Sequence, residues 1–346
     1  MQRKNESMFW LNDARLLAAT AIIFVHFIQS VGGTLNASLG TLDWWEINFF
    51  SAFTMWGVPV FVMISGALLL STEKEYATPS DFYSRRLSRL GIPILFWTLF
   101  YLALTFLKSQ ILGQSLDLEA LGMDVIAGRP YGHMWYLYMV FGLYLFTPFL
   151  RKIAKYSSDS EMKLLVAMLM FISFLSVLTH DVKLHHSTIF IFMFPAYLAY
   201  FFAGHLIMRT SFSIKTINLL LLILLFGLLT ALGSYASAKY GWRTSFHNNF
   251  SLTMIPLSIS IMLLAKNMHD KFKMGESVRN SLATFTLGAY LIHPVLIGII
   301  VQTRYLGFDM SSFTVLKILI LTSLIILLSL IIAYVFSKLP LLRRVI

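Results

Sequence analysis

The sequence contains no cysteine and few charged residues. Among its 346 residues there is no Cys, and only 12% are Asp, Glu, Lys or Arg, about half the share found in soluble domains. The missing cysteine excludes disulfides, thiolate nucleophiles and thiolate metal sites. The low charge, together with 58% hydrophobic residues and a mean hydropathy of +0.74, excludes a soluble domain of any size and indicates a membrane protein.

The hydrophobic residues lie in long continuous runs, such as 219–232, which favours membrane-spanning helices over strands. We predict an all-α, polytopic protein with a single transmembrane domain over residues 1–346. Ten spans are expected, at 14–33, 47–71, 90–108, 134–151, 163–180, 187–208, 215–237, 248–266, 282–303 and 312–337.

The basic residues predict the orientation of these spans. With the N-terminus in the cytoplasm, 20 of the 27 Lys and Arg residues fall on the cytoplasmic side, as the positive-inside rule requires. Both termini are therefore expected in the cytoplasm. Because topology accounts for the net charge of +11, that charge does not call for a nucleic-acid partner.

Acidic residues are missing from the middle of every predicted span. Ion-coupled transporters often bury a carboxylate there to bind protons or cations, so this absence argues against that class. Two histidines do lie in mid-span, His26 and His293, each about eleven residues beyond the cytoplasmic start of its span. They are therefore expected at similar depth.

Arg15 and His26 are expected to share one face of the first helix. Eleven residues, at about 100° each, return a helix to within about 20° of its starting direction, about 16 Å further along. A buried ionisable side chain in a span usually marks a functional site. The alternative is that His26 links neighbouring helices and that Arg15 is an ordinary basic residue of the interface.

His293 is followed directly by Pro294. Proline has no backbone N–H, so it leaves a carbonyl free one turn earlier and kinks the helix. A functional role and a structural link are both open for His293 at this stage.

A cluster of three arginines precedes the third span. In a helix Arg86 and Arg89 would be i,i+3 neighbours, and Arg85 and Arg89 i,i+4 neighbours. Arginine binds phosphate bidentately, so this cluster could hold the nucleotide end of a cytosolic cofactor. The alternative is topology charge or contact with lipid phosphates.

Two short motifs have mainly structural interpretations. Ser65-Gly66 in the second span allows close helix packing. Asn12 and Asp13 are expected to cap the start of the first helix.

Two aromatic segments fit the outer membrane interface, where tryptophan and tyrosine gather. The first contains Trp44 and Trp45. The second is His133-Met-Trp135-Tyr-Leu-Tyr138, which by composition alone is an aromatic belt with a histidine in it.

Five motifs follow one another along the chain: Asp13-Ala-Arg15 followed by ten residues and His26, Val58-Pro-Val-Phe-Val-Met-Ile-Ser65-Gly66, Arg86-Leu-Ser-Arg89 before Pro93, His133-Met-Trp135-Tyr-Leu, and Tyr290-Leu-Ile-His293-Pro294. As an ordered set they resemble the acyltransferase 3 family of integral membrane O-acyltransferases, over essentially the whole chain. One position departs from the longer members, because Val140 stands where they carry a glutamate. The chain looks like the short, stand-alone branch, which includes surface-glycan O-acetyltransferases.

The resemblance implies transfer of an acyl group, usually acetyl, from cytosolic acyl-CoA to a sugar hydroxyl of a cell-surface or lipid-linked glycan, in a bacterial cytoplasmic membrane. Arg86 and Arg89, with Arg85 beside them, would hold the nucleotide end of the donor. The thioester would pass Arg15 and reach His26, as general base or transient acyl carrier.

The remaining candidates are His293 for the reaction centre, and His133 and Trp135 for the acceptor. Acyl-CoA is expected as a substrate, with no metal and no permanently bound cofactor. A second hypothesis is a transporter or flippase whose path is lined by His26 and His293, and a third is a membrane scaffold with structural histidines. A flippase would leave its cargo unmodified, whereas an acyltransferase would label it covalently.

Overall fold

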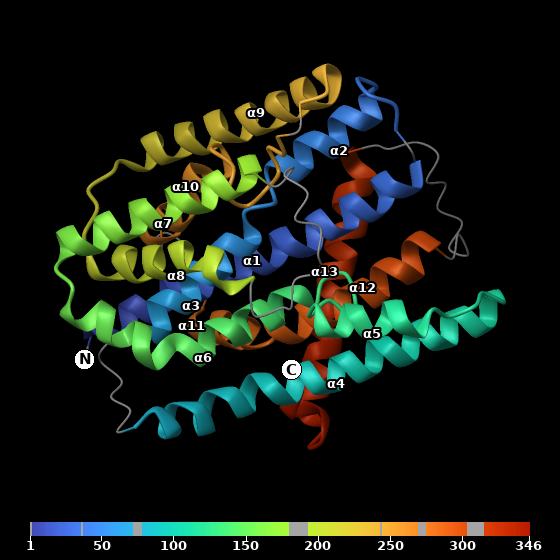
Figure 1. Cartoon of the computed structure of the whole chain (residues 1–346), viewed down its shortest axis with the longest axis horizontal. Helices are drawn as coiled ribbons and strands as arrows, with labels where there is room; N and C mark the ends of the chain where they lie inside the picture. The colour runs from blue at the N-terminus through green and yellow to red at the C-terminus, as the bar shows by residue number, and fades with distance from the viewer. Residues whose placement is uncertain are drawn as a thin grey trace.

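The computed structural model describes residues 2–35, 37–71, 78–179, 193–242, 244–268, 275–302 and 315–346. Residues 180, 187–192, 303 and 312–314 of the predicted spans lie outside this part of the chain. All regular structure among the described residues is helical (Figure 1), which confirms the all-α prediction.

The first half of the chain forms α1 (Gln2–Leu35), α2 (Leu42–Ala52), α3 (Gly57–Leu69), α4 (Pro79–Leu112), α5 (Leu118–Ile126) and α6 (Trp135–Tyr156). The second half forms α7 (Asp159–Thr179), α8 (Phe194–Arg209), α9 (Thr216–Tyr240), α10 (Met254–Met268), α11 (Glu276–Thr284), α12 (Thr286–Gln302), α13 (Val315–Lys338) and the 3₁₀ turn η3 (Leu342–Arg344).

These helices make a multi-pass membrane protein, although they differ in length. Among the described residues, seven stretches are long and apolar enough to cross a membrane, or eight if the bent pair α11 and α12 forms one span. By contrast, α8 has 16 residues and α10 has 15, fewer than the roughly 20 that cross the hydrocarbon core. The count of ten spans and the orientation of the termini therefore stay predictions.

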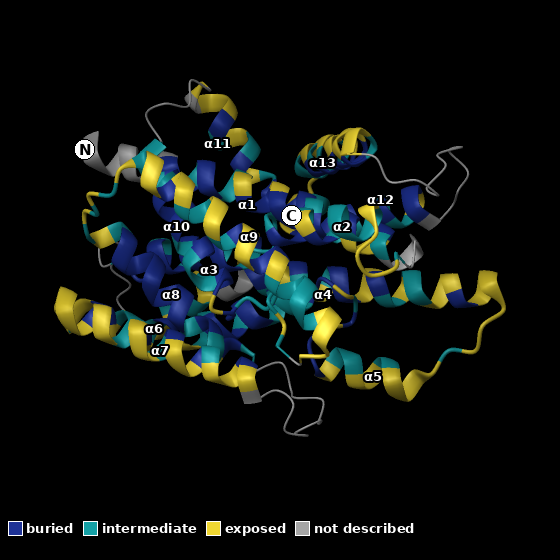
Figure 2. Cartoon of the chain, turned by 90° about the horizontal axis from the view of Figure 1, so that it is seen from above, coloured by how far each residue is buried: buried dark blue, intermediate teal, exposed yellow. Residues whose placement is uncertain are grey.

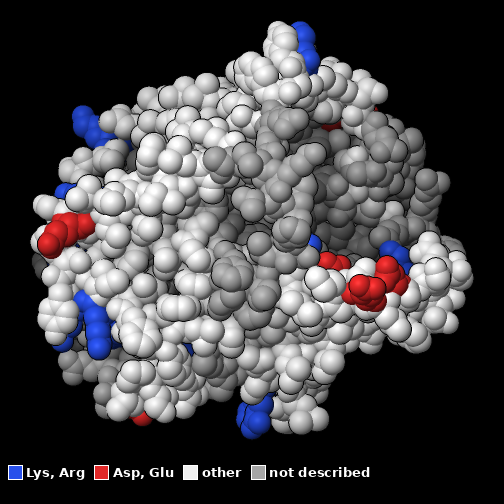
Figure 3. Space-filling model, in the orientation of Figure 1, with Lys and Arg blue, Asp and Glu red and all other residues white. Residues whose placement is uncertain are grey.

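Helix α1 runs through the middle of the bundle, while α4 and α9 lie along opposite sides of it (Figure 1). The peripheral helices are largely coloured as exposed in Figure 2. Large apolar residues are among the exposed ones, including Leu95 and Leu99 of α4, Leu221 of α9 and Leu316 of α13. On the face shown in Figure 3, broad areas carry no Lys, Arg, Asp or Glu, and these residues lie in small groups. Such faces suit contact with lipid rather than water.

The backbones of α3 and α8 touch where the two helices cross. A Cβ atom added to Gly66 would lie 1.8 Å from the carbonyl oxygen of Phe201, and one added to Gly204 would lie 1.8 Å from that of Met63. Only glycine fits at either position, as in other close crossings of membrane helices. The packing role predicted for Ser65-Gly66 is thereby confirmed.

The prediction that Asn12 and Asp13 cap the first helix is wrong. Neither Pro nor Gly interrupts residues 2–13, so α1 begins at Gln2 and both residues lie inside it. Asp13 instead forms a buried ion pair with Arg279 of α11, with 3.1 Å between Oδ1 and Nε. The Asn12 Nδ2 donates to Asn280 Oδ1 at 2.8 Å, so this polar pair joins α1 to α11.

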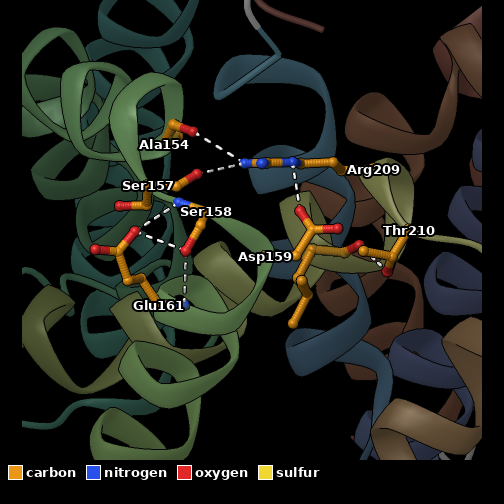
Figure 4. A network of polar contacts seen from close by, with 8 residues as sticks. Ala154, Ser157, Ser158, Asp159, Glu161, Arg209 and Thr210 are labelled. Atoms are coloured by element: carbon orange, nitrogen blue, oxygen red, sulfur yellow. Dashed lines mark hydrogen bonds and ion pairs between the residues drawn. The ribbon is translucent and has the colours of Figure 1, made fainter.

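Arg209 ties the end of α8 to the turn between α6 and α7 (Figure 4). Its Nη1 donates to the carbonyl oxygens of Ser157, at 2.9 Å, and Ala154, at 3.4 Å. Its Nε lies 2.8 Å from Asp159 Oδ1. A cation placed at the free carbonyls of a helix C-terminus is favourable because it satisfies them and opposes the helix dipole.

Two more cations act in the same way. Arg151 Nη1 donates to the carbonyl of Leu69, at the end of α3. Lys266 Nζ donates to the carbonyls of Ile207 and Thr210, at the end of α8. We call this side of the bundle, defined by Arg151, Arg209 and Lys266, the basic end; it is the side predicted to face the cytoplasm.

Candidate functional site

His26 of α1 and His293 of α12 lie side by side in the interior. Their rings are stacked, with 5.0 Å between centroids and 5° between planes. The Nδ1 of His26 is 2.7 Å from the Nε2 of His293, a hydrogen-bond distance. Sequence placed the two histidines at similar depth, and the structure brings them into direct contact.

Pro294 determines which protons this pair carries. The carbonyl left free by a proline belongs to the residue four positions earlier, which here is Tyr290. His293 Nδ1 lies 2.6 Å from this carbonyl and must donate to it, because a carbonyl oxygen only accepts. With both imidazoles neutral, His293 Nε2 then accepts from His26 Nδ1, and the lone pair of His26 is left on Nε2.

The bend of this span lies elsewhere. The helices α11 and α12 meet at 53° around Phe285, whereas α12 continues as a helix through Pro294. The proline therefore acts mainly through the carbonyl that it frees, and the sharp change of direction occurs two turns earlier.

A third imidazole, that of His133, completes the cluster. Its ring meets the ring of His293 edge-on, 5.5 Å between centroids. It is 3% exposed, and neither of its nitrogens has a hydrogen-bond partner among the described residues. Burial first, and neighbouring His26 second, lower the pKa of His133 well below its usual range, so at pH 7 it is neutral, with one N–H donor and one acceptor to offer.

Aromatic residues hold His133 in place. The Tyr290 hydroxyl donates to the backbone carbonyl of His133. The Tyr101 hydroxyl donates to the backbone carbonyl of Leu291 at 2.6 Å. The rings of Tyr101 and Tyr131 stack 4.3 Å apart, with His133 against the edge of Tyr101 at 5.0 Å. The segment 133–138, which was expected to form an aromatic belt at the interface, thus has its histidine, His133, buried in the interior.

A cavity of about 570 Å³ lies against the three histidines, within the range of ordinary ligand sites. Its walls come from α1, α3, α12 and the segments before α6 and α10, and include His26, Gln29, Met55, His133, Trp135, Asn249 and Pro294. We call it the histidine cavity. The structure therefore brings together four of the predicted site residues, namely His26, His133, Trp135 and His293.

Arg15 lies further down α1, toward the basic end. It is partly buried and interacts electrostatically with the hydroxyls of Tyr144 and Tyr136 on α6. Tyr136 also hydrogen-bonds with Ser65. The arginine is thus held among neutral hydroxyls, where its charge remains available to an anion.

The predicted arginine cluster does lie on one helix, the first turns of α4. Arg85 and Arg89 are exposed and Arg86 is half-buried. The histidine cavity is lined by none of the three, so the structure does not bring this cluster to the histidines.

Sequence reasoning missed three contributors to this site. Tyr101 of α4 packs against the His133 ring. Gln29 lines the cavity one turn beyond His26. Asn249 also lines it, and its buried Oδ1 has no partner in the described part of the chain. A polar side chain within an apolar run was the available signal for Tyr101 and Gln29. Asn249 lies in a loop, where polarity is ordinary and gives no signal.

The chemistry available here is that of a positioned imidazole base beside a cavity whose described lining residues are uncharged. Among the described residues, no group of three or more His, Asp or Glu side chains is arranged to hold a metal ion. The His26 lone pair, the His133 N–H and the distant Arg15 are the groups that could act on a substrate.

Comparison with known proteins agrees with the motifs. Searches among curated proteins and among solved structures give no match. The model of the family described as an acyltransferase domain, acyltransferase 3, matches residues 8–337. That match covers nearly the whole chain, including every residue of the histidine cluster, and the chain belongs to this acyltransferase 3 family of membrane proteins.

Proposed function

We propose that this protein is an O-acyltransferase that moves an acyl group, most simply acetyl, from cytosolic acyl-CoA to a sugar hydroxyl of a cell-surface or lipid-linked glycan. Its setting would be a bacterial cytoplasmic membrane. Membership of the family supports acyl transfer, and the histidine cluster supports the assignment of the reacting groups.

One observation carries the proposal, namely the hydrogen-bond chain from the Tyr290 carbonyl through His293 to His26. A base oriented by a second group, itself held by a third, is the arrangement that activates hydroxyl nucleophiles in other acyl-transfer sites. Here His293 is the orienting group and the carbonyl holds its tautomer. His26 Nε2 is the atom that would take the proton.

In the proposed reaction, His26 Nε2 removes the proton of the sugar hydroxyl while the hydroxyl oxygen attacks the thioester carbonyl carbon. The tetrahedral intermediate then breaks its carbon–sulfur bond. The departing thiolate takes the proton from the imidazolium, so that the products are the sugar ester and free CoA thiol. His26 returns to its neutral form, and the step needs no further reactant.

The acceptor would enter by the histidine cavity. Trp135 would cover one face of the sugar, and the His133 N–H would donate to a substrate oxygen. Donation to the developing oxyanion would be worth more than donation to the resting carbonyl. His133 suits either role because both its nitrogens are unpartnered among the described residues.

The donor would approach from the basic end. Arg86 and Arg89, with Arg85 nearby, would bind the phosphates of the nucleotide, since guanidinium groups match phosphate bidentately. Arg15 lies between this end and His26 along α1, and its charge would guide the polar arm of the donor toward the histidines.

The test is transfer of label by the purified protein. Protein in lipid nanodiscs is given acetyl-CoA labelled in the acetyl group, together with lipid-linked and free glycans from cells lacking the gene. We expect label in covalent linkage to glycan, and surface glycans that differ by the mass of one acetyl group between cells with and without the gene. Glycan that stays unlabelled in this assay, but crosses the bilayer of proteoliposomes containing the protein, would instead establish a flippase and overturn the proposal.

A further inference from the structure

A second cavity, of about 450 Å³, lies beside the histidine cavity. Trp44 and Asn48 of α2 form one part of its wall, and Ser234 in the last turns of α9 forms another. Trp242 and His247, which follow α9, complete it. Gln29 of α1 lines both cavities. Because Gln29 is one helical turn from His26, the two cavities meet close to the proposed base.

The described residues that line the second cavity are uncharged. None of them is Asp, Glu, Lys or Arg. The titratable residue among them is His247, whose pKa is lowered by burial, so the imidazole is neutral at pH 7. This part of the wall therefore suits a neutral polar ligand.

Asn48, which lines this cavity, has a buried oxygen that needs an O–H or N–H partner. Asn48 is 5% exposed. Its Nδ2 donates to the carbonyl of Ala231 at 2.9 Å, but its Oδ1 is buried and has no partner among the described residues. Nearly all such buried oxygens accept a hydrogen bond, so this one calls for a donor on a ligand. The Ser234 hydroxyl, 3.0 Å from His247 Nδ1, adds a second polar group to the same cavity.

Aromatic rings form the other part of the wall. The ring of Trp44 is fixed by edge-on contacts with Trp45, at 5.2 Å, and with Tyr235, at 5.7 Å. Trp242 lies against Tyr240 at 5.9 Å. A fixed indole face covers C–H groups well. Trp44, expected to lie among lipid headgroups, is therefore part of a cavity that combines an indole with an unpaired amide oxygen.

We propose that the second cavity is an acceptor subsite for a neutral sugar unit adjacent to the unit that is acylated. A pyranose ring offers a C–H face for Trp44 and hydroxyl donors for Asn48. The inference rests on the proposed function and deepens it, because a ligand filling both cavities is an oligosaccharide or longer glycan. The enzyme would then prefer acceptors of two or more linked sugars over single sugars.

The test measures binding as well as turnover. Full-length protein in nanodiscs, without acyl-CoA, is titrated with cellotriose, maltotriose and chitotriose and with their monosaccharides, by calorimetry. We expect at least one trisaccharide to bind more tightly than its monosaccharide. Trp44→Leu should weaken that binding about five- to tenfold, as expected for loss of one aromatic contact.

Phe49→Leu is the control. Phe49 is another aromatic residue of α2, but it does not line the cavity and makes neither of the ring contacts that fix Trp44. It should keep trisaccharide binding near the wild-type value. Equal losses in the two variants would make both residues interfacial anchors and overturn the subsite, as would failure of the wild-type protein to bind any trisaccharide.

Asn48→Ser tests the amide oxygen separately. It should weaken the trisaccharide and leave the monosaccharide unchanged, whereas equal loss for both ligands would contradict a subsite for the adjacent sugar. These binding results stand even if no acetyl is transferred, so failure of the subsite and failure of the proposed function give different outcomes.

Discussion

At the basic end of the bundle, cationic side chains donate to backbone carbonyls, whereas at the end with the two cavities several buried polar atoms have no protein partner among the described residues. The first group consists of Arg151, Arg209 and Lys266. The second consists of both nitrogens of His133 and the amide oxygens of Asn48 and Asn249. Polar groups satisfied within the protein stabilise it, while unsatisfied ones are expected where a ligand supplies the partner.

The difference also separates two kinds of charged residue. Asp13 and Arg15 belong to the same motif. Among the described residues, Asp13 forms an ion pair with Arg279 of α11. Arg15 is surrounded by tyrosine hydroxyls instead. We propose that these residues, two positions apart on one helix, serve stability and chemistry respectively, and the following experiments test that division.

The most complete test is topological, because reporter fusions give an all-or-none signal. Fusions after residues 120 and 242, at the cavity end, should report an external location. Fusions after 157 and 212, at the basic end, should report the cytoplasm, as the distribution of basic residues requires. An external signal at 212 would place acyl-CoA and the basic end on opposite sides of the membrane and remove the proposed route of the donor.

Replacing His26 should have the largest effect on rate. In His26→Gln the side chain can still hydrogen-bond but cannot accept a proton at neutral pH. We expect acetyl transfer to fall about 10²–10⁴-fold, the usual cost of losing a positioned base, while acyl-CoA binding and thermal stability stay close to wild type. Transfer at a near wild-type rate would reduce His26 to a structural link and leave His293 as the better candidate.

Arg279→Met should act in the opposite way, on stability. The variant removes the Arg279 partner of the buried Asp13 carboxylate, and breaking a buried ion pair costs about 3–5 kcal/mol. The melting temperature in detergent should fall clearly. The double variant Asp13→Leu with Arg279→Met should recover much of the loss, and the lack of such recovery would show that the pair is not coupled.

Pro294→Ala tests how the tautomer is fixed. Alanine restores a backbone N–H that competes for the Tyr290 carbonyl, so His293 is held less well and His26 loses its orientation. We expect kcat to fall about tenfold, which corresponds to one hydrogen bond, with KM for acetyl-CoA unchanged. A matched change in α12 away from the cluster, Ile299→Ala, controls for altered packing; an equal fall in kcat there would exclude the specific role of the proline.

The smallest effects are expected at the arginines of α4. Arg86→Lys and Arg89→Lys keep the charge but lose the bidentate geometry. Acyl-CoA binding should weaken about fivefold in each, with protein levels unchanged. Arg343→Lys, an exposed arginine near the C-terminus, serves as the control. Normal binding in both α4 variants would make these arginines topology charges only.

The sequence predicted the helical class, the close packing at Gly66 and the shared depth of His26 and His293, because each depends on local pattern or span length. It could not predict that the two histidines touch, since that depends on how α1 and α12 pack. The role of Asp13 was missed for the same reason. Its partner, Arg279, is distant in sequence. An aspartate also suits both a helix N-cap and an ion pair, so the residue type does not distinguish the two roles.

The second cavity could not be predicted from the sequence for a different reason. Trp44 looks the same in sequence whether it meets lipid or sugar, because both uses need an amphipathic ring. Only the arrangement of α2 against α9 and the following loop distinguishes them. The sequence also could not show that the amide oxygen of Asn48 lacks a partner. That follows only from the structure, in which the amide nitrogen of Asn48 donates to the carbonyl of Ala231.

The carbonyl that Pro294 leaves free also bears on how the protein is made. Many hydrolases orient their histidine with an aspartate, but a carboxylate at the centre of a span costs about 2.5–3.5 kcal/mol when the helix enters the membrane. A main-chain oxygen carries no charge, so α12 can leave the translocon as an ordinary apolar helix. A proline alone then frees the carbonyl that holds His293, and the histidine pair that we propose as the reaction centre forms only when α12 meets α1 within the bilayer.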